Sequence, residues 1–86
     1  MKFSIVIPVY NESKNLPLLI SQIYKVLKNH TFELIIIDDN SSDGTFEVLN
    51  KIKKKNFRFF IRKEKRDLSR SCVLGFNKSK YKNILV

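Results

Sequence analysis

The feature of this sequence that most constrains its fold is an unbroken apolar run, Leu34-Ile35-Ile36-Ile37, which leads directly into Asp38 and Asp39. A strand with one face in water alternates apolar and polar residues, and this run does not. Strands without alternation are typical of parallel sheets that helices cover on both faces. The run therefore predicts a strand over residues 32–38, buried on both sides, in a domain of the α/β class.

The rest of the chain alternates between strand and helix patterns. Segments rich in Val, Ile and Phe predict three more strands, over residues 2–9, 56–62 and 83–86. Apolar residues recur every three or four positions between them, which predicts helices over residues 14–28, 45–54 and 67–79. The order β-α-β-α-β-α-β, with right-handed crossovers, predicts a Rossmann-like parallel sheet with helices on both faces.

Composition excludes several classes of protein. The chain has 86 residues and a hydrophobic fraction of 43%, which suits one small domain and is too apolar for a disordered segment. No apolar run approaches the roughly 18–20 residues that span a bilayer, and the apolar stretch before Pro8 is too short for a signal-peptide core. Cys72 has no second cysteine to pair with and suits a packing role in a reducing compartment. We therefore expect a cytoplasmic location.

Charge is distributed unevenly along the chain. The formal net charge is +9, and counting Lys, Arg, Asp and Glu gives −2 for residues 1–50 and +11 for residues 51–86. A basic half attracts anions in general, including nucleic acid, acidic phospholipid and diphosphate ligands. One interpretation is therefore a non-catalytic basic module that binds nucleic acid or an anionic surface. Against this interpretation, the aromatic side chains between positions 57 and 60 fall in a strand pattern that favours their burial in the core. We therefore expect no nucleic-acid partner.

Polar residues follow two of the predicted strands at the point where each ends. The first strand continues into Tyr10 and Glu12, and the second ends in Asp38 and Asp39. Ligands of open parallel sheets bind beyond the carboxyl ends of the strands. If the two strands are neighbours, Glu12 and Asp39 project into one crevice, where a carboxylate can accept the ring N–H of uracil or guanine, or a ribose hydroxyl. Tyr10 offers a flat face for the base.

Each of these polar residues also has a structural interpretation when it is taken alone. Asp38 suits turn capping, and Glu12 suits the positive end of a helix dipole. Ser42 or Asp43 is the expected N-cap of the helix that begins at residue 45. Gly44 suits a turn that requires unusual backbone geometry. An aspartate pair is also found in receiver-type signalling domains, but those place it after the first strand.

The combination is more specific than its parts. Pro-x-Tyr-Asn-Glu within "SIVIPVYNESKNL" and Asp-Asp-x-Ser-x-Asp-Gly-Thr within "FELIIIDDNSSDGT" resemble the family 2 glycosyltransferases of the GT-A fold, and among them the polyprenol-phosphate (dolichol-phosphate mannose synthase-like) sugar transferases. The resemblance covers essentially all 86 residues. It implies transfer of a sugar from a UDP- or GDP-sugar to a polyprenyl phosphate or another acceptor, at the cytoplasmic face of the membrane. The nucleotide-binding positions it implies are Pro8, Tyr10, Glu12, Ile37 and Asp39, with Asp39 reading the base and Asp38 structural.

The same resemblance implies that some of the machinery lies elsewhere. The family's Asp-any-Asp motif, which binds Mg²⁺ or Mn²⁺ against the donor diphosphate, would follow Val86. The catalytic and acceptor groups lie further on. We therefore expect residues 1–86 to be the N-terminal nucleotide-sugar-binding part of a larger domain, without catalytic or metal-ligating residues and inactive alone. A complete small α/β unit is the alternative.

One segment departs from the family pattern. Many relatives have a Gly-Leu-Gly-like stretch before the third helix, where this chain has Arg66-Asp67-Leu68-Ser69-Arg70. Arg66 or Arg70 could reach a nucleotide from here, or both could lie in solvent, and the sequence leaves these alternatives open.

Overall fold

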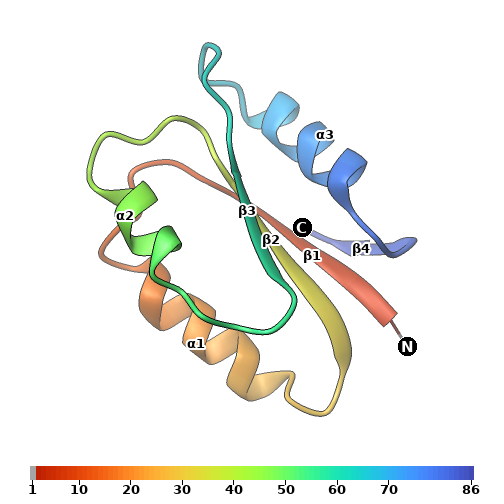
Figure 1. The fold of residues 1–86 in the computed structure, drawn as a ribbon. Helices are drawn as coiled ribbons and strands as arrows, with labels where there is room; N and C mark the ends of the chain where they lie inside the picture. Colours follow the sequence, from red (N-terminus) through yellow and green to blue (C-terminus); the bar gives the residue numbers. More distant parts are fainter. Residues whose placement is uncertain (1) are drawn as a thin grey trace.

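A four-stranded parallel sheet forms the centre of the computed structural model, which describes residues 2–86 (Figure 1). The strand order is β3-β2-β1-β4. The strands are β1 (Lys2–Val9), β2 (Thr31–Asp38), β3 (Phe57–Ile61) and β4 (Asn83–Leu85). The helices between them are α1 (Leu16–Val26), α2 (Thr45–Asn50) and α3 (Leu68–Lys78). The predicted element order and the parallel Rossmann-like sheet are therefore confirmed.

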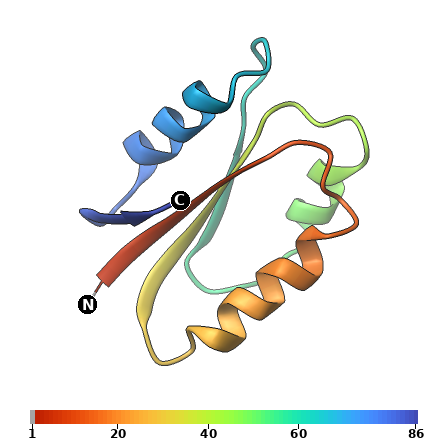
Figure 2. The same cartoon turned by 180° about the vertical axis from the view of Figure 1, so that it is seen from behind.

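Helices cover both faces of the sheet, as Figures 1 and 2 show: α1 and α2 lie on one face and α3 on the other. Side chains of Leu34 and Ile36 pack on the first face, against Leu16, Ile20 and Leu49. Ile35 and Ile37 point to the opposite face, where they pack with Val6 and Leu74 of α3. All four side chains of the run 34–37 have no exposed surface, which confirms the prediction from its missing alternation.

Gly75 allows α3 to approach the sheet closely. A Cβ atom added at this position would lie 2.1 Å from Cγ1 of Val6, a distance at which one of the two elements would have to move. The glycine thus sets the depth at which α3 packs on β1 and β2. This depth also decides where the first turn of α3 lies relative to the strand ends.

Element ends differ from the predictions by a few residues. α1 begins at Leu16 because a turn precedes it, in which the N–H groups of Asn15 and Leu16 both donate to the carbonyl of Glu12. α2 ends at Asn50 and not at residue 54, because the chain tightens there and the Ile52 N–H bonds to the carbonyl of Leu49, three residues back.

The prediction that Ser42 or Asp43 is the N-cap of α2 is wrong, because the N-cap is the residue after Asp43. Gly44 is the N-cap, with φ of +90°, a conformation that glycine adopts without steric cost. The Asp43 carboxylate still accepts the Thr45 N–H at 3.2 Å and the Thr45 hydroxyl, so its side chain supports the helix start from the preceding residue.

A buried carboxylate links the strands at the edge of the sheet where the parallel strands begin. Glu33 is 3% exposed and accepts hydrogen bonds from the Ser4 hydroxyl at 2.6 Å, the Arg58 guanidinium at 2.8 Å and the Lys80 N–H at 2.5 Å. Burial opposes ionisation of Glu33, but these hydrogen bonds together outweigh it and lower its pKa. The network links β1, β2, β3 and the connection to β4.

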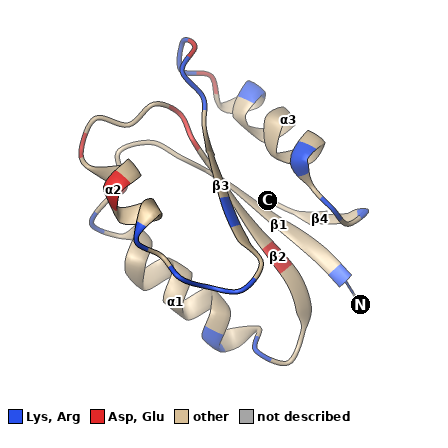
Figure 3. Cartoon of the chain, in the orientation of Figure 1, with Lys and Arg blue, Asp and Glu red and all other residues tan. Residues whose placement is uncertain are grey.

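Most basic residues lie on connections and helices (Figure 3); on the strands of the described residues, only Lys2 of β1 and Arg58 of β3 are basic. The lysine-rich run 51–55 forms the connection from α2 to β3, with its lysines exposed. Phe57, Phe59 and Phe60 are partly buried and pack against the two cores. Of the helices described, none has the length and apolar character needed to cross a membrane.

Candidate functional site at the carboxyl edge of the sheet

Three strand ends meet at the carboxyl edge of the sheet. Val9 is paired with Asp38 in the parallel register of β1 and β2, and the Asp39 N–H donates to the Val9 carbonyl at 3.0 Å. The Arg62 N–H, which follows β3, donates to the Asp38 carbonyl at 2.8 Å. The prediction that the first two strands are neighbours is therefore confirmed. Arg62, the residue after the third strand, lies at the same edge.

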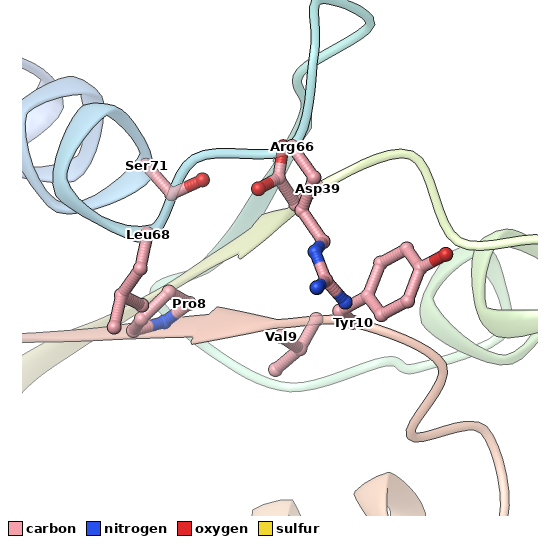
Figure 4. Close-up of a pocket in the computed structure, with 7 residues that line it drawn as sticks. All are labelled: Pro8, Val9, Tyr10, Asp39, Arg66, Leu68 and Ser71. Carbon is pink, nitrogen blue, oxygen red and sulfur yellow. The ribbon is translucent and has the colours of Figure 1, made fainter.

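A pocket of about 370 Å³ opens at this edge, between the end of β1 and the first turn of α3 (Figure 4). Successive strand residues point to alternate faces, so Pro8, Tyr10 and Asp39 continue the face of the sheet that α3 covers. The volume lies within the range of small-molecule sites, about 300–1,000 Å³. The pocket is lined by Pro8, Val9, Tyr10, Asp39, Arg66, Leu68 and Ser71.

Asp39 is held in one orientation from two sides. Its side chain is 6% exposed; Oδ1 accepts a hydrogen bond from Arg62 Nε at 3.2 Å and Oδ2 accepts the Asp67 N–H at 2.7 Å. Each oxygen of an ionised carboxylate can accept about two hydrogen bonds. Both oxygens therefore keep acceptor capacity for a ligand N–H or O–H donor in the pocket.

Asp38 has a different environment from its neighbour. It is 1% exposed, and its carboxylate accepts hydrogen bonds from the backbone N–H and the hydroxyl of Ser41. Ser41 in turn accepts the Asn11 N–H at 2.7 Å, and the Asn11 side-chain carbonyl accepts the Ser42 N–H at 2.9 Å. The first aspartate thus holds the loops after β1 and β2 together, which supports the structural role expected for it.

Asp43 adds a second tie between the same loops. Its Oδ2 atom accepts the Ser13 N–H at 3.1 Å, in addition to the contacts with Thr45 described above. The hydrogen bond from the Thr45 hydroxyl is the largest contribution, and with the others it lowers the pKa of Asp43 against the effect of desolvation.

Glu12 does not line the pocket. Its side chain is exposed and accepts a hydrogen bond from Asn15 Nδ2 at 3.0 Å. The reason is the left-handed backbone of Asn11, with φ of +52°, which ends the strand alternation and directs Glu12 into the turn before α1. The structure thus places Glu12 and Asp39 on neighbouring loops but does not bring their side chains into a shared cavity.

Ile37 lies two residues before Asp39, further into the sheet. Its side chain has no exposed surface and packs in the core beneath α3. Three of the five predicted site residues therefore line the pocket, namely Pro8, Tyr10 and Asp39. The assignment of all five as nucleotide-binding residues stays a prediction.

Arg66 reaches into the pocket, whereas Arg70 does not line it. The Arg66 guanidinium carbon lies 4.5 Å from the centroid of the Tyr10 ring, a cation–π geometry that Figure 4 shows. Arg70 stays on α3, where its Nε lies 3.7 Å from Oδ2 of Asp67. Of the two arginines that the sequence left open, only Arg66 is placed to contact a ligand here.

Sequence reasoning missed Arg62 and three residues that line the pocket, Val9, Leu68 and Ser71. Arg62 directly follows the end of β3, so the strand-end argument used for the first two strands would also have selected it. Ser71 lies inside a helix, where nothing in the sequence marks it, and only the packing of α3 shows that it faces the pocket.

No group of three or more His, Cys, Asp or Glu side chains in the described part of the chain could hold a metal ion. The residues of the pocket therefore do not by themselves fit a divalent cation. The pocket instead combines one oriented carboxylate, one arginine, one aromatic face and one hydroxyl.

A family model, "Glycosyl transferase family 2", matches residues 4–86, which include every residue of the pocket. The chain belongs to glycosyl transferase family 2. The resemblance of the two sequence motifs is thereby confirmed, and the parallel sheet with its pocket at the carboxyl edge is consistent with the nucleotide-binding half of the GT-A fold.

Three curated proteins of related sequence are sugar transferases by name. The chain is similar to a dolichol-phosphate mannosyltransferase of Pyrococcus furiosus, with 36% identity over 80 residues, 92% of this chain and 23% of the relative. It is also similar to undecaprenyl-phosphate 4-deoxy-4-formamido-L-arabinose transferases. For that of Photorhabdus laumondii the identity is 48% over 50 residues, 56% of this chain and 15% of the relative. For that of Pseudomonas savastanoi pv. phaseolicola the identity is 40% over 60 residues, which are 67% of this chain and 18% of the relative. The chain thus spans less than a quarter of the length of these family 2 relatives.

Proposed function

We propose that this chain provides the donor-nucleotide site of a glycosyltransferase that uses a nucleoside-diphosphate sugar. The observation that carries the proposal is the orientation of Asp39: a buried carboxylate at the carboxyl edge of a parallel sheet, fixed by Arg62 and by the Asp67 N–H, and facing a pocket. In a family 2 chain this arrangement suits recognition of a uracil or guanine base.

Five of the seven residues that line the pocket have a role in this proposal. Asp39 accepts the ring N–H of the base, and Tyr10 stacks on one face of the ring. Arg66, which lies over Tyr10, supplies positive charge for the diphosphate. Pro8 and Leu68 exclude water from the edge of the base.

The divalent cation expected for this family, Mg²⁺ or Mn²⁺, neutralises charge that develops on the diphosphate leaving group when it is bound. Because the described residues do not form a carboxylate cluster, we propose that the ligands of this cation lie outside residues 1–86. The same holds for the groups that bind the acceptor.

The acceptor we propose is a polyprenyl phosphate, by analogy with the dolichol-phosphate and undecaprenyl-phosphate transferases to which the chain is similar. A phosphate oxygen of such a lipid attacks the anomeric carbon of the donor sugar, and the nucleoside diphosphate leaves. Because this nucleophile is already an anion, the reaction has less need of a general base than transfer to a hydroxyl group. We place the reaction at the cytoplasmic face of a membrane, where such an acceptor is held.

Calorimetric titration of the chain with UDP and GDP tests the proposal. We expect binding of at least one of them and a roughly 10- to 100-fold weaker affinity for Asp39→Ala, since hydrogen bonds to a charged group contribute about 1.5–3 kcal/mol. Glu47→Ala is the matched control, because Glu47 is exposed on α2 and does not line the pocket. Equal affinity of the Asp39→Ala variant and the parent, or no binding of either nucleotide by the parent, would show that the site assignment is wrong.

A further inference from the structure

Ser71 carries an unpartnered polar atom. Within residues 2–86, its Oγ is the one buried side-chain nitrogen or oxygen without a hydrogen-bond partner. The residue has no exposed surface, lies in the first turn of α3 and lines the pocket. Buried polar groups in native proteins are nearly always paired, so this exception calls for a physical reason.

Other serines in the structure show how a buried or helical hydroxyl is normally paired. Ser79 donates its hydroxyl to the carbonyl of Gly75, four residues back, at 2.8 Å, and Ser4 donates to Glu33 at 2.6 Å. At Ser71 the carbonyl four residues back, that of Asp67, accepts only the Ser71 N–H, at 3.0 Å. The hydroxyl of Ser71 therefore lacks the helix partner that such side chains commonly use.

The pocket offers the hydroxyl a partner from outside the protein. Figure 4 shows the Ser71 hydroxyl directed from α3 toward the side of the pocket on which the Asp39 carboxylate lies. Arg66 and Leu68, the neighbouring wall residues, are exposed, Leu68 by 67%. Neither is part of the core, so both can shift when a ligand enters the pocket.

We infer that Ser71 is a specificity-determining residue that selects the base of the nucleotide bound here. The inference rests on the proposed donor-nucleotide function. The Asp39 carboxylate accepts the ring N–H of the base, and the Ser71 hydroxyl donates to the carbonyl oxygen next to that N–H. Uracil and guanine present this pair, N3–H beside O4 and N1–H beside O6. Cytosine and adenine present an unprotonated ring nitrogen beside an amino group.

The test compares Ser71→Ala with the parent in calorimetric titrations with UDP, GDP, CDP and ADP. Ser69→Ala is the matched control, because Ser69 is exposed on the same helix and does not line the pocket. We expect Ser71→Ala to weaken binding of the preferred keto-base nucleotide about fivefold, as for one neutral hydrogen bond. Binding of CDP and ADP, and all affinities of Ser69→Ala, stay at the parent values.

Thermal unfolding of the same variants separates a ligand contact from a structural role. An unpartnered hydroxyl contributes nothing to folding, so Ser71→Ala should unfold at the parent temperature or above it. Parental affinity for the keto bases, an equal loss for all four nucleotides, or a clear drop in unfolding temperature would each overturn the inference while the proposed function stands. A parent chain that binds none of the four nucleotides would overturn the proposed function and the inference together.

Discussion

Arg62 and Asp39 form a buried ion pair across the ends of β3 and β2, with Arg62 Nε 3.2 Å from Asp39 Oδ1 and side chains that are 5% and 6% exposed. The pair links the fold to the site, because the guanidinium that orients the pocket-lining carboxylate also donates to the carbonyl of Lys65 in the loop before α3. A buried pair adds little net stability, but loss of one partner leaves a buried charge uncompensated.

Replacement of Arg62 by methionine should therefore destabilise the chain by about 3 kcal/mol, because the Asp39 carboxylate keeps its burial and loses its counter-charge. Urea unfolding at neutral pH measures the change. Lys63→Met, next to it and exposed, is the control. A loss below about 1 kcal/mol for Arg62→Met would mean that water or another cation compensates Asp39, contrary to this account.

The Glu33 network predicts a pH dependence of stability. The folded state lowers the pKa of Glu33 from its ordinary value of 4.5, so its ionised form stabilises the fold above that pH. This contribution is lost as the pH falls below 4.5 and through the folded-state pKa.

Glu33→Gln should accordingly lower the free energy of unfolding by about 2 kcal/mol at pH 7 and by progressively less below pH 4.5. Urea unfolding between pH 7 and pH 3 gives the difference between parent and variant. Glu47→Gln, an exposed glutamate on α2, should track the parent throughout. A difference for Glu33→Gln that stays constant with pH would contradict the lowered pKa.

Gly75→Ala should destabilise the chain by about 1–3 kcal/mol, because the added methyl group meets Cγ1 of Val6 at 2.1 Å. The second substitution Val6→Ala removes that methyl and should recover part of the loss, so the double variant is more stable than the sum of the single effects implies. Chemical denaturation of the four proteins gives the coupling energy. If the stability losses of the two single variants simply add, the added methyl group does not meet Val6, and α3 must lie further from β1 than in this structure.

Arg66→Ala should act on ligand binding and leave stability nearly unchanged. Arg66 and Tyr10 are both exposed, and an exposed cation–π contact contributes only about 0.5–1 kcal/mol. Loss of the charge should weaken UDP or GDP binding about 3- to 10-fold and uridine or guanosine binding much less, since only the diphosphates carry the anion. Arg70→Ala is the control on the same segment. Equal losses for diphosphate and nucleoside would place Arg66 against the base and not the diphosphate.

The fold was largely predictable because the local pattern and the tertiary burial agree. The run of residues 34–37 lacks alternation, and in the structure each of its side chains is buried. The ends of α1 and α2 were less predictable, because they depend on single backbone bonds such as Ile52 N–H to Leu49 carbonyl. Such bonds leave no pattern of hydrophobic residues.

The site was predictable only in part. Tyr10 and Asp39 follow the strand-end rule, and the structure places both in the pocket. Glu12 follows the same rule but leaves the pocket, because one residue with positive φ, Asn11, redirects the chain. Arg62 directly follows β3 and satisfies the same rule, although it was missed. Ser71 lies inside α3 and is marked only by its burial, which neither periodicity nor spacing encodes.

A nucleotide titration followed by two-dimensional amide NMR tests the central claim most directly. If the pocket at the carboxyl edge binds the nucleotide, UDP or GDP should shift the amide signals of Tyr10, Asp39 and Asp67, whose N–H bonds to the Asp39 carboxylate. Signals at the amino-terminal edge, around the cavity lined by Tyr24, Lys28 and His30, should stay in place. Shifts confined to that second cavity, or no shifts at millimolar nucleotide, would contradict the account.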